Sequence, residues 1–121
     1  MKHDVKYHPQ KNMVIMKMEG KIKLAQAAIP LNSAVNKMLE FGCDKLFIDL
    51  SKTINDVDNI DNFKLQKLFK EVGLNPNNKQ AVVVAHNFQN RKKLENFCIY
   101  HDFYVKFFTN AQKAKQWLSV Q

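Results

Sequence analysis

The chain has 121 residues, of which 45% are hydrophobic, and a formal net charge of +8 at pH 7. Its length suits one domain, its apolar content excludes a disordered chain, and no repeat or linker marks a second unit, so we expect a single domain over residues 1–121. Only one of the 19 basic residues is an arginine and the lysines form no run, which argues against a base-reading or phosphate-clamping surface.

Alternation of polar and apolar residues predicts two strands at the start of the chain. The first contains Val5 and Tyr7, and the second contains Val14, Met16 and Met18. The residues between them, Pro-Gln-Lys-Asn at 9–12, are turn formers. The two strands should therefore form an antiparallel hairpin.

A helical pattern follows from Leu24 to Gly42, where a glycine can close a helix in the left-handed conformation. Pro30 should kink this helix or confine the residues before it to a short lead-in, with the regular helix starting near Asn32 or Ser33. Residues 45–50 then form a nearly continuous apolar run, which predicts a central strand covered on both faces.

The next elements are a polar loop from Ile54 to Asn59 and a helix over residues 60–72, for which Asp58 is a candidate cap. The β-branched segment 80–85 predicts a second buried strand. We expect it to lie beside the strand at 45–50.

The last third of the chain predicts a helix, a strand and a helix. The third helix is marked by an apolar stripe, and a short strand over 104–108 and a final helix over 111–118 follow it. Thr109 and Gln112 have capping-box spacing. The stripe of the third helix consists of Leu94, Phe97, Cys98 and His101.

The order β-β-α-β-α-β-α-β-α predicts an α/β fold. Its sheet should be mixed but mostly parallel, with an N-terminal antiparallel hairpin and about four helices. Crossovers between parallel strands should be right-handed.

Several core and turn segments carry a resemblance to a known family. They are 18–22 (MEGKI), 46–51 (LFIDLS), 81–84 (AVVV), 103–111 (FYVKFFTNA) and Ala114 with Trp117-Leu118. On these segments, within residues 13–118, the chain resembles the STAS family of sulfate-transporter and anti-sigma-factor-antagonist domains, and more closely its STAS/Sec14-like branch. The resemblance implies a non-enzymatic regulatory domain that binds other proteins, in some members through a switch serine in the loop after the central strand.

The family's switch element, Asp-Ser-Ser-Gly, is absent from this chain. The corresponding loop, residues 55–61, reads Asn-Asp-Val-Asp-Asn-Ile-Asp, and Ser51 and Thr53 come too early to be equated with the switch residue. We therefore expect no phosphoserine switch. The predicted partner-contact loop consists of Asp56, Asp58, Asn59 and Asp61. The expected partner is another protein, and a second copy of the chain is a further candidate.

The three aspartates of this loop are also candidate ligands for a hard cation, or a permanent mimic of a phosphorylated loop. Their spacing does not fit an EF-hand, because the sixth position would be Asp61 and the twelfth Lys67. Acidic residues before a helix more commonly cap its free N–H groups. We expect no metal and no cofactor.

The sequence contains no catalytic motif. Three glycines cannot build a phosphate-binding or dinucleotide loop, and there is no G-x-S-x-G. His3 and His8 should point to opposite faces of one strand. His86 follows a buried strand, where α/β proteins often place functional groups, but no nucleophile or carboxylate adjoins it. We predict that the protein is not an enzyme.

Cys43 and Cys98 belong to no Cys-x-x-Cys pair and to no zinc-like cluster, so both should be free, packed thiols, as in a reducing cytosol. The amino terminus lacks the apolar stretch of a signal peptide, and no segment is long enough to span a membrane. These features predict a cytoplasmic protein without membrane contact.

Two alternative functions remain open at this stage. Nonspecific polyanion binding would follow from the net charge and would weaken steeply with salt. An apolar ligand or lipid pocket, as in Sec14-like proteins, is the other, although core packing is the simpler role for the aromatic residues that would line it. Those residues are Phe63, Phe69, Phe97, Phe107, Phe108 and Trp117.

Overall fold

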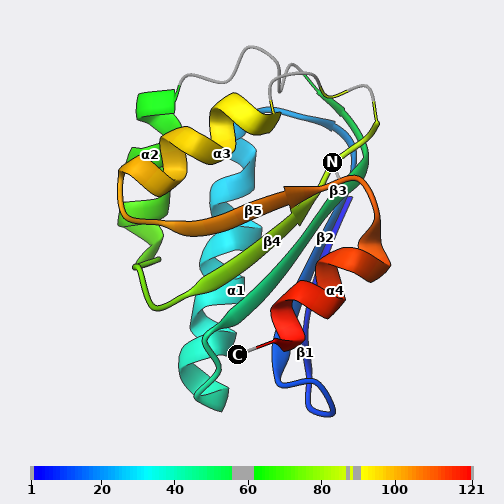
Figure 1. The fold of residues 1–121 in the computed structure, drawn as a ribbon, viewed down its shortest axis with the longest axis vertical. Helices are drawn as coiled ribbons and strands as arrows, with labels where there is room; N and C mark the ends of the chain where they lie inside the picture. The colour runs from blue at the N-terminus through cyan, green and yellow to red at the C-terminus, as the bar shows by residue number, and fades with distance from the viewer. Residues whose placement is uncertain (1, 56–61, 87, 89–90, 121) are drawn as a thin grey trace.

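The computed structural model describes residues 2–55, 62–86, 88 and 91–120. Five strands form one sheet in the order β1-β2-β3-β4-β5 (Figure 1). The pair β1–β2 is antiparallel and the other pairs are parallel, and residues 45–49 of β3 pair with residues 79–83 of β4. The predicted hairpin and the two neighbouring central strands are thus confirmed. The strands are β1 (Lys2–His8), β2 (Met13–Ile22), β3 (Lys45–Asn55), β4 (Lys79–Val83) and β5 (Tyr104–Phe108).

Helices cover the two faces of the sheet unequally. Three helices lie on one face and α4 lies alone on the other (Figure 1). A short 3-10 helix, η1 (Leu24–Ala27), leads from β2 into α1. No helix in the described part of the chain is long and apolar enough to cross a membrane. The helices are α1 (Ala28–Phe41), α2 (Asn62–Val72), α3 (Arg91–Tyr100) and α4 (Ala111–Ser119).

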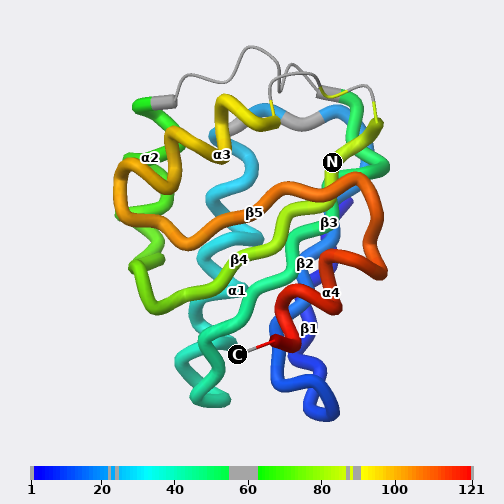
Figure 2. Tube along the Cα trace, viewed as in Figure 1, coloured from blue at the N-terminus to red at the C-terminus, as the bar shows by residue number. Residues whose placement is uncertain are grey.

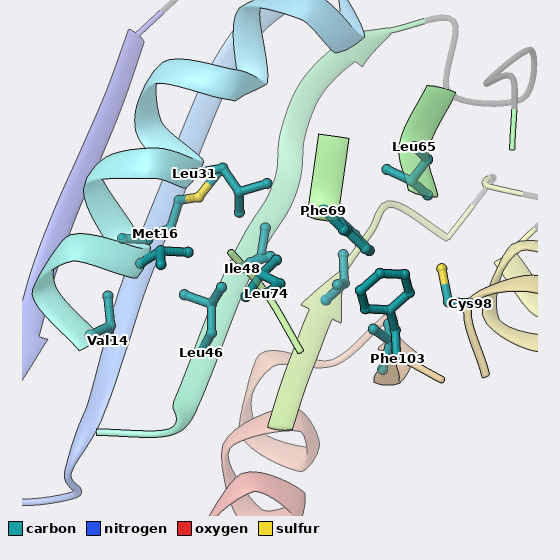
Figure 3. Packing of buried hydrophobic residues seen from close by; sticks show 14 of the residues in the cluster. Val14, Met16, Leu31, Leu46, Ile48, Leu65, Phe69, Leu74, Cys98 and Phe103 are labelled. Atoms are coloured by element: carbon teal, nitrogen blue, oxygen red, sulfur yellow. The ribbon is translucent and has the colours of Figure 1, made fainter. Parts of the chain in front are cut away.

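The two-residue period of the strands divides the apolar side chains between two cores. In β3, Leu46 and Ile48 face α1, α2 and α3, whereas Phe47 faces α4. The first core is the larger, and Figure 3 shows Leu31 of α1 and Phe69 of α2 packed over the strands. The residues that form both cores are buried. The smaller core beneath α4 consists of Met13, Phe47, Ala81, Val83, Ala114 and Leu118.

The short lead-in predicted before the regular helix is present as η1, but the predicted start near Asn32 or Ser33 was wrong. The helix begins at Ala28, so Pro30 is its third residue and is buried. The first four N–H groups of a helix have no partner within it, so a proline in this turn removes no hydrogen bond. Gly42 ends the helix in the left-handed conformation, with φ of 61°, as expected.

The central strand is longer than predicted. Apolar content marks only residues 45–50, but β3 continues to Asn55 because residues 52–55 pair with residues 19–22 of β2. Ile54 and Asn55, which were predicted to open the polar loop, therefore belong to the strand. The expected cap of α4 was also wrong, because Asn110, and not Thr109, accepts the hydrogen bond from the Lys113 N–H at 2.9 Å.

Lys79 of β4 fastens the end of α4 to the sheet. Its ammonium group donates to the carbonyl oxygens of Trp117 and Val120, the latter at 2.6 Å, and lies 4.4 Å from the Trp117 ring centroid. A cation at the carboxyl end of a helix opposes the partial negative charge there. Burial, and secondarily the charge of Lys45, lowers the pKa of Lys79.

Candidate protein-contact site

The candidate site lies at the carboxyl end of the parallel strands. Strands β2 to β5 run in one direction, so the segments that follow them lie at one end of the sheet, where α1 and α2 begin (Figure 2). The predicted contact residues lie between the end of β3 and the start of α2, outside the residues that the structure describes. They are Asp56, Asp58, Asn59 and Asp61.

Among the described residues, three large apolar side chains are exposed at this end of the fold. Ile29 in the first turn of α1 is 70% exposed, Ile54 near the end of β3 is 73% exposed, and Phe63 at the start of α2 is 73% exposed. We call these three residues the apical apolar set. Large apolar side chains that remain exposed in a folded protein can mark an interaction site. The sequence analysis named Phe63 only as a candidate pocket residue and did not identify Ile29 or Ile54, because exposure depends on how the helices pack.

Contacts between α2 and α3 hold Phe63 in place. Its ring lies edge-on to the ring of Phe97, with centroids 5.8 Å apart and an interplanar angle of 83°. One turn further along α2, the amide nitrogen of Gln66 lies 3.0 Å from Nδ1 of His101, which follows α3. The start of α2 is therefore oriented by two side-chain contacts to the neighbouring helix segment.

Ser51 and Thr53 lie within β3 and not in the loop after it. The Ser51 N–H and O–H both donate to one carboxylate oxygen of Asp49, at 2.9 and 2.6 Å. The Thr53 hydroxyl donates to the backbone oxygen of Leu50 at 2.7 Å. Both hydroxyls are thus engaged beside the strand backbone.

Among the described residues, the side chains that could perform nucleophilic or metal chemistry are dispersed. No three His, Cys, Asp or Glu residues of this part of the chain are grouped so that they could hold a metal ion. Burial, and secondarily the charge of Glu95, raises the pKa of Cys98 to about 12, so its thiol stays protonated. Cys43 is also buried and free, and its sulfur lies 3.1 Å from the Asn12 carbonyl oxygen.

The histidines are distributed over separate surfaces. His3 is opposite Met18 and His8 is opposite Met13, so the two point to opposite faces of β1, as predicted. His8 accepts a hydrogen bond from the Lys11 N–H at 3.4 Å. His86 follows β4 and is exposed.

The six aromatic residues that the sequence offered for an apolar pocket do not surround one space. Phe69 and Phe107 pack in the core beneath α1, α2 and α3, whereas Phe108 and Trp117 pack beneath α4. The sheet separates the two groups. Phe63 is exposed at the apical end, against Phe97.

No family model and no curated protein sequence matches this chain. A solved structure does: the crystal structure of an anti-sigma factor antagonist from Mycobacterium paratuberculosis is similar with a TM-score of 0.60. The match covers 97% of this chain and 92% of that chain, with 16% sequence identity. At this identity the likeness establishes the fold and not the function. It confirms the resemblance seen in the sequence: this chain has the STAS fold.

Proposed function

We propose that this chain is a non-catalytic, regulatory protein-binding domain whose contact surface is the carboxyl end of its sheet. The observation that carries the proposal is the apical apolar set, Ile29, Ile54 and Phe63, which three different elements present at one end of the fold. When a partner covers large apolar side chains that are exposed to water in the free protein, the free energy of the system falls, and this favours binding.

The sequence that connects two members of this set is acidic. Asp56, Asp58 and Asp61 lie between Ile54 and Phe63 in a chain whose net charge is +8. A negative segment adjacent in sequence to exposed apolar side chains favours a partner with a basic surface around an apolar centre. The fold likeness to a protein named as an anti-sigma factor antagonist agrees with a role in protein contacts.

We further propose that contact is not switched by phosphorylation of this loop. Residues 55–61 contain no hydroxyl group. Phosphate on the nearby Ser51 would stand against the Asp49 carboxylate, whose oxygen is 2.6 Å from the Ser51 hydroxyl oxygen. Two negative groups at this distance repel each other, which disfavours the modification.

Site-specific photocrosslinking tests the location of the contact. A photoreactive phenylalanine analogue would replace Phe63 in one version of the chain and Leu39, in α1 near the opposite end of the sheet, in the control. Leu39 is a matched control because it is 77% exposed. We expect a defined protein to be captured from position 63 and not from position 39.

The purified partner would then be titrated against an Ile54→Ser, Phe63→Ser variant and against Leu39→Ser. We expect affinity to fall about tenfold or more for the double variant, and to be unchanged for Leu39→Ser. Equal affinity of the double variant and the wild type would refute the proposed surface, as would capture from position 39 alone.

A further inference from the structure

The two edge strands of the sheet, β5 and β1, differ in what lies against their outer side. At the β5 edge, the buried Glu95 of α3 accepts a hydrogen bond from the backbone N–H of Phe107. At the other edge, β1 pairs with β2 and packs against α1, and no described strand lies beyond it. An open edge presents unpaired backbone N–H and C=O groups that can pair with another strand.

The residues of β1 allow a further strand to pair with this edge. Its seven residues contain no proline, and their register with β2 runs without a shift from Lys2 to His8. Proline and bulges are common devices that block a strand edge. Lysine is another, and β1 has Lys2 and Lys6, but Asp4 lies between them on the same face.

We propose that β1 pairs antiparallel with β1 of a second copy of this chain, about a two-fold axis at Val5. A two-fold axis perpendicular to the sheet keeps each face of one copy continuous with the same face of the other. This requires one residue to lie directly opposite its own copy, with the axis midway between the two. Val5 is the midpoint of Lys2–His8, so this choice alone overlaps all seven residues. The result is one continuous ten-stranded sheet.

Charge complementarity selects the same centre. About Val5, Asp4 of each copy lies opposite Lys6 of the other, on the face where Asp4 and Lys6 already form an ion pair of 3.4 Å. A centre at Asp4 would place Asp4 opposite itself, and a centre at Lys6 would place Lys6 opposite itself. Unlike charges directly opposite stabilise a strand pair and like charges destabilise it.

The opposite face of β1 offers apolar area for a second copy to cover. Val5 and Tyr7 are only partly buried against the main core. The Tyr7 ring stacks on Phe41 of α1 with centroids 4.2 Å apart, and Phe41 is 47% exposed. In the proposed pair Val5 lies opposite its own copy and Tyr7 opposite His3, so both faces of the junction contribute contacts.

A charge swap tests the pairing by sedimentation velocity over a concentration series. Asp4→Lys and Lys6→Asp each convert two unlike pairs into two like pairs, and we expect the dimer association constant to fall about tenfold or more. The double variant restores unlike pairs and should dimerise as the wild type does. Lys93→Asp, exposed on α3, is the control for net charge and should change nothing.

Amide hydrogen exchange at low and high protein concentration locates the contact. The amides of β1 should exchange more slowly at high concentration, whereas those of β5 should not change. A wild type that stays monomeric at its highest soluble concentration would overturn the proposal. So would single variants that dimerise normally, a double variant that fails to recover, or a dimer without added protection of β1. The proposal does not depend on the apical apolar set, whose substitution should leave the dimer intact.

Discussion

The carboxylate of Glu95 accepts a hydrogen bond of 2.7 Å from the backbone N–H of Phe107, which joins α3 to the outer edge of β5. The N–H faces outward because the neighbouring carbonyl oxygen, that of Phe108, accepts from the Val84 N–H on the inner side. Glu95 is 8% exposed and Lys92 lies 3.5 Å from its other oxygen. One buried carboxylate therefore both satisfies an edge amide and holds a helix over it.

Replacing Glu95 by alanine should destabilise the fold by about 1–3 kcal/mol, because the Phe107 N–H loses its acceptor. Glu95→Gln keeps an acceptor oxygen and should have a smaller effect. Urea denaturation measures both changes. The matched control is Glu71→Ala on α2, whose ion pair with Lys67 is exposed, and it should change stability by less than about 1 kcal/mol. Equal effects at the two positions would contradict the role given to Glu95.

Substitution of Gln80 by methionine should stabilise the protein. Gln80 is completely buried in β4, and neither its amide nitrogen nor its amide oxygen has a hydrogen-bond partner among the described residues. Burial of an unsatisfied amide is unfavourable by about 1–3 kcal/mol, and methionine has a similar shape without the polar atoms. A rise in the free energy of unfolding of roughly 1 kcal/mol is expected in the same urea assay. Gln116→Met on the exposed side of α4 should leave it unchanged, and a destabilised Gln80→Met would show that the amide has a role.

Neither cysteine should react with a thiol reagent at pH 8 while the chain is folded. Both are buried, and the raised pKa of Cys98, about 12, keeps its thiol protonated. Ellman's reagent should report no thiol in the native protein and two in urea. Rapid reaction of one native thiol would contradict this.

The same pKa has a consequence for stability in alkaline solution. The unfolded chain releases the Cys98 proton near its ordinary pKa of 9.0, whereas the folded chain retains it up to about 12. Above pH 9 the unfolded state therefore binds fewer protons, and stability falls as the pH rises, by about 1 kcal/mol per pH unit from this group. Thermal unfolding of the wild type between pH 9 and 11 should show a steeper decline than that of Cys98→Ala. Parallel profiles would contradict it.

Charge reversal in the loop should weaken partner binding. Asp58→Lys with Asp61→Lys converts the acidic segment into a basic one, and a partner with a basic surface would then be repelled. Quantitative pull-down compares this variant with Glu40→Lys, Asp44→Lys, which makes the same charge change at the opposite end of the sheet. We expect partner recovery to fall only for the loop variant. An identical set of partners for both would remove the loop from the contact surface.

The sequence predicted the order of elements because each buried strand is marked by its own residues. The run at 45–50 and the β-branched segment at 80–85 need two covered faces, which an α/β sheet supplies. The same logic failed at the end of β3. Residues 51–55 are polar or isolated, and they are extended because β2 pairs with them, which is a tertiary contact that no local pattern contains.

The residues of the candidate site were harder to predict from the sequence than the fold. An isoleucine at 29 or 54 has the same pattern whether a neighbouring helix covers it or not, so the apical apolar set became apparent only with the packing. Glu95 shows the converse. A glutamate that lies outside the apolar stripe of its helix suggests a solvated position. Only the adjacent strand edge explains the burial of Glu95.

Because α4 covers its face of the sheet without another described helix, that face depends on α4 for cover while the chain is being synthesised. Every strand of the described residues precedes α4, so the side chains that it covers, including Phe47 and Val83, have no apolar cover from it until residues 111–119 leave the ribosome. Until then a nascent sheet would expose an apolar surface that other chains and chaperones can bind. Folding of residues 111–119 onto the sheet is therefore the step that removes this apolar face from contact with other chains.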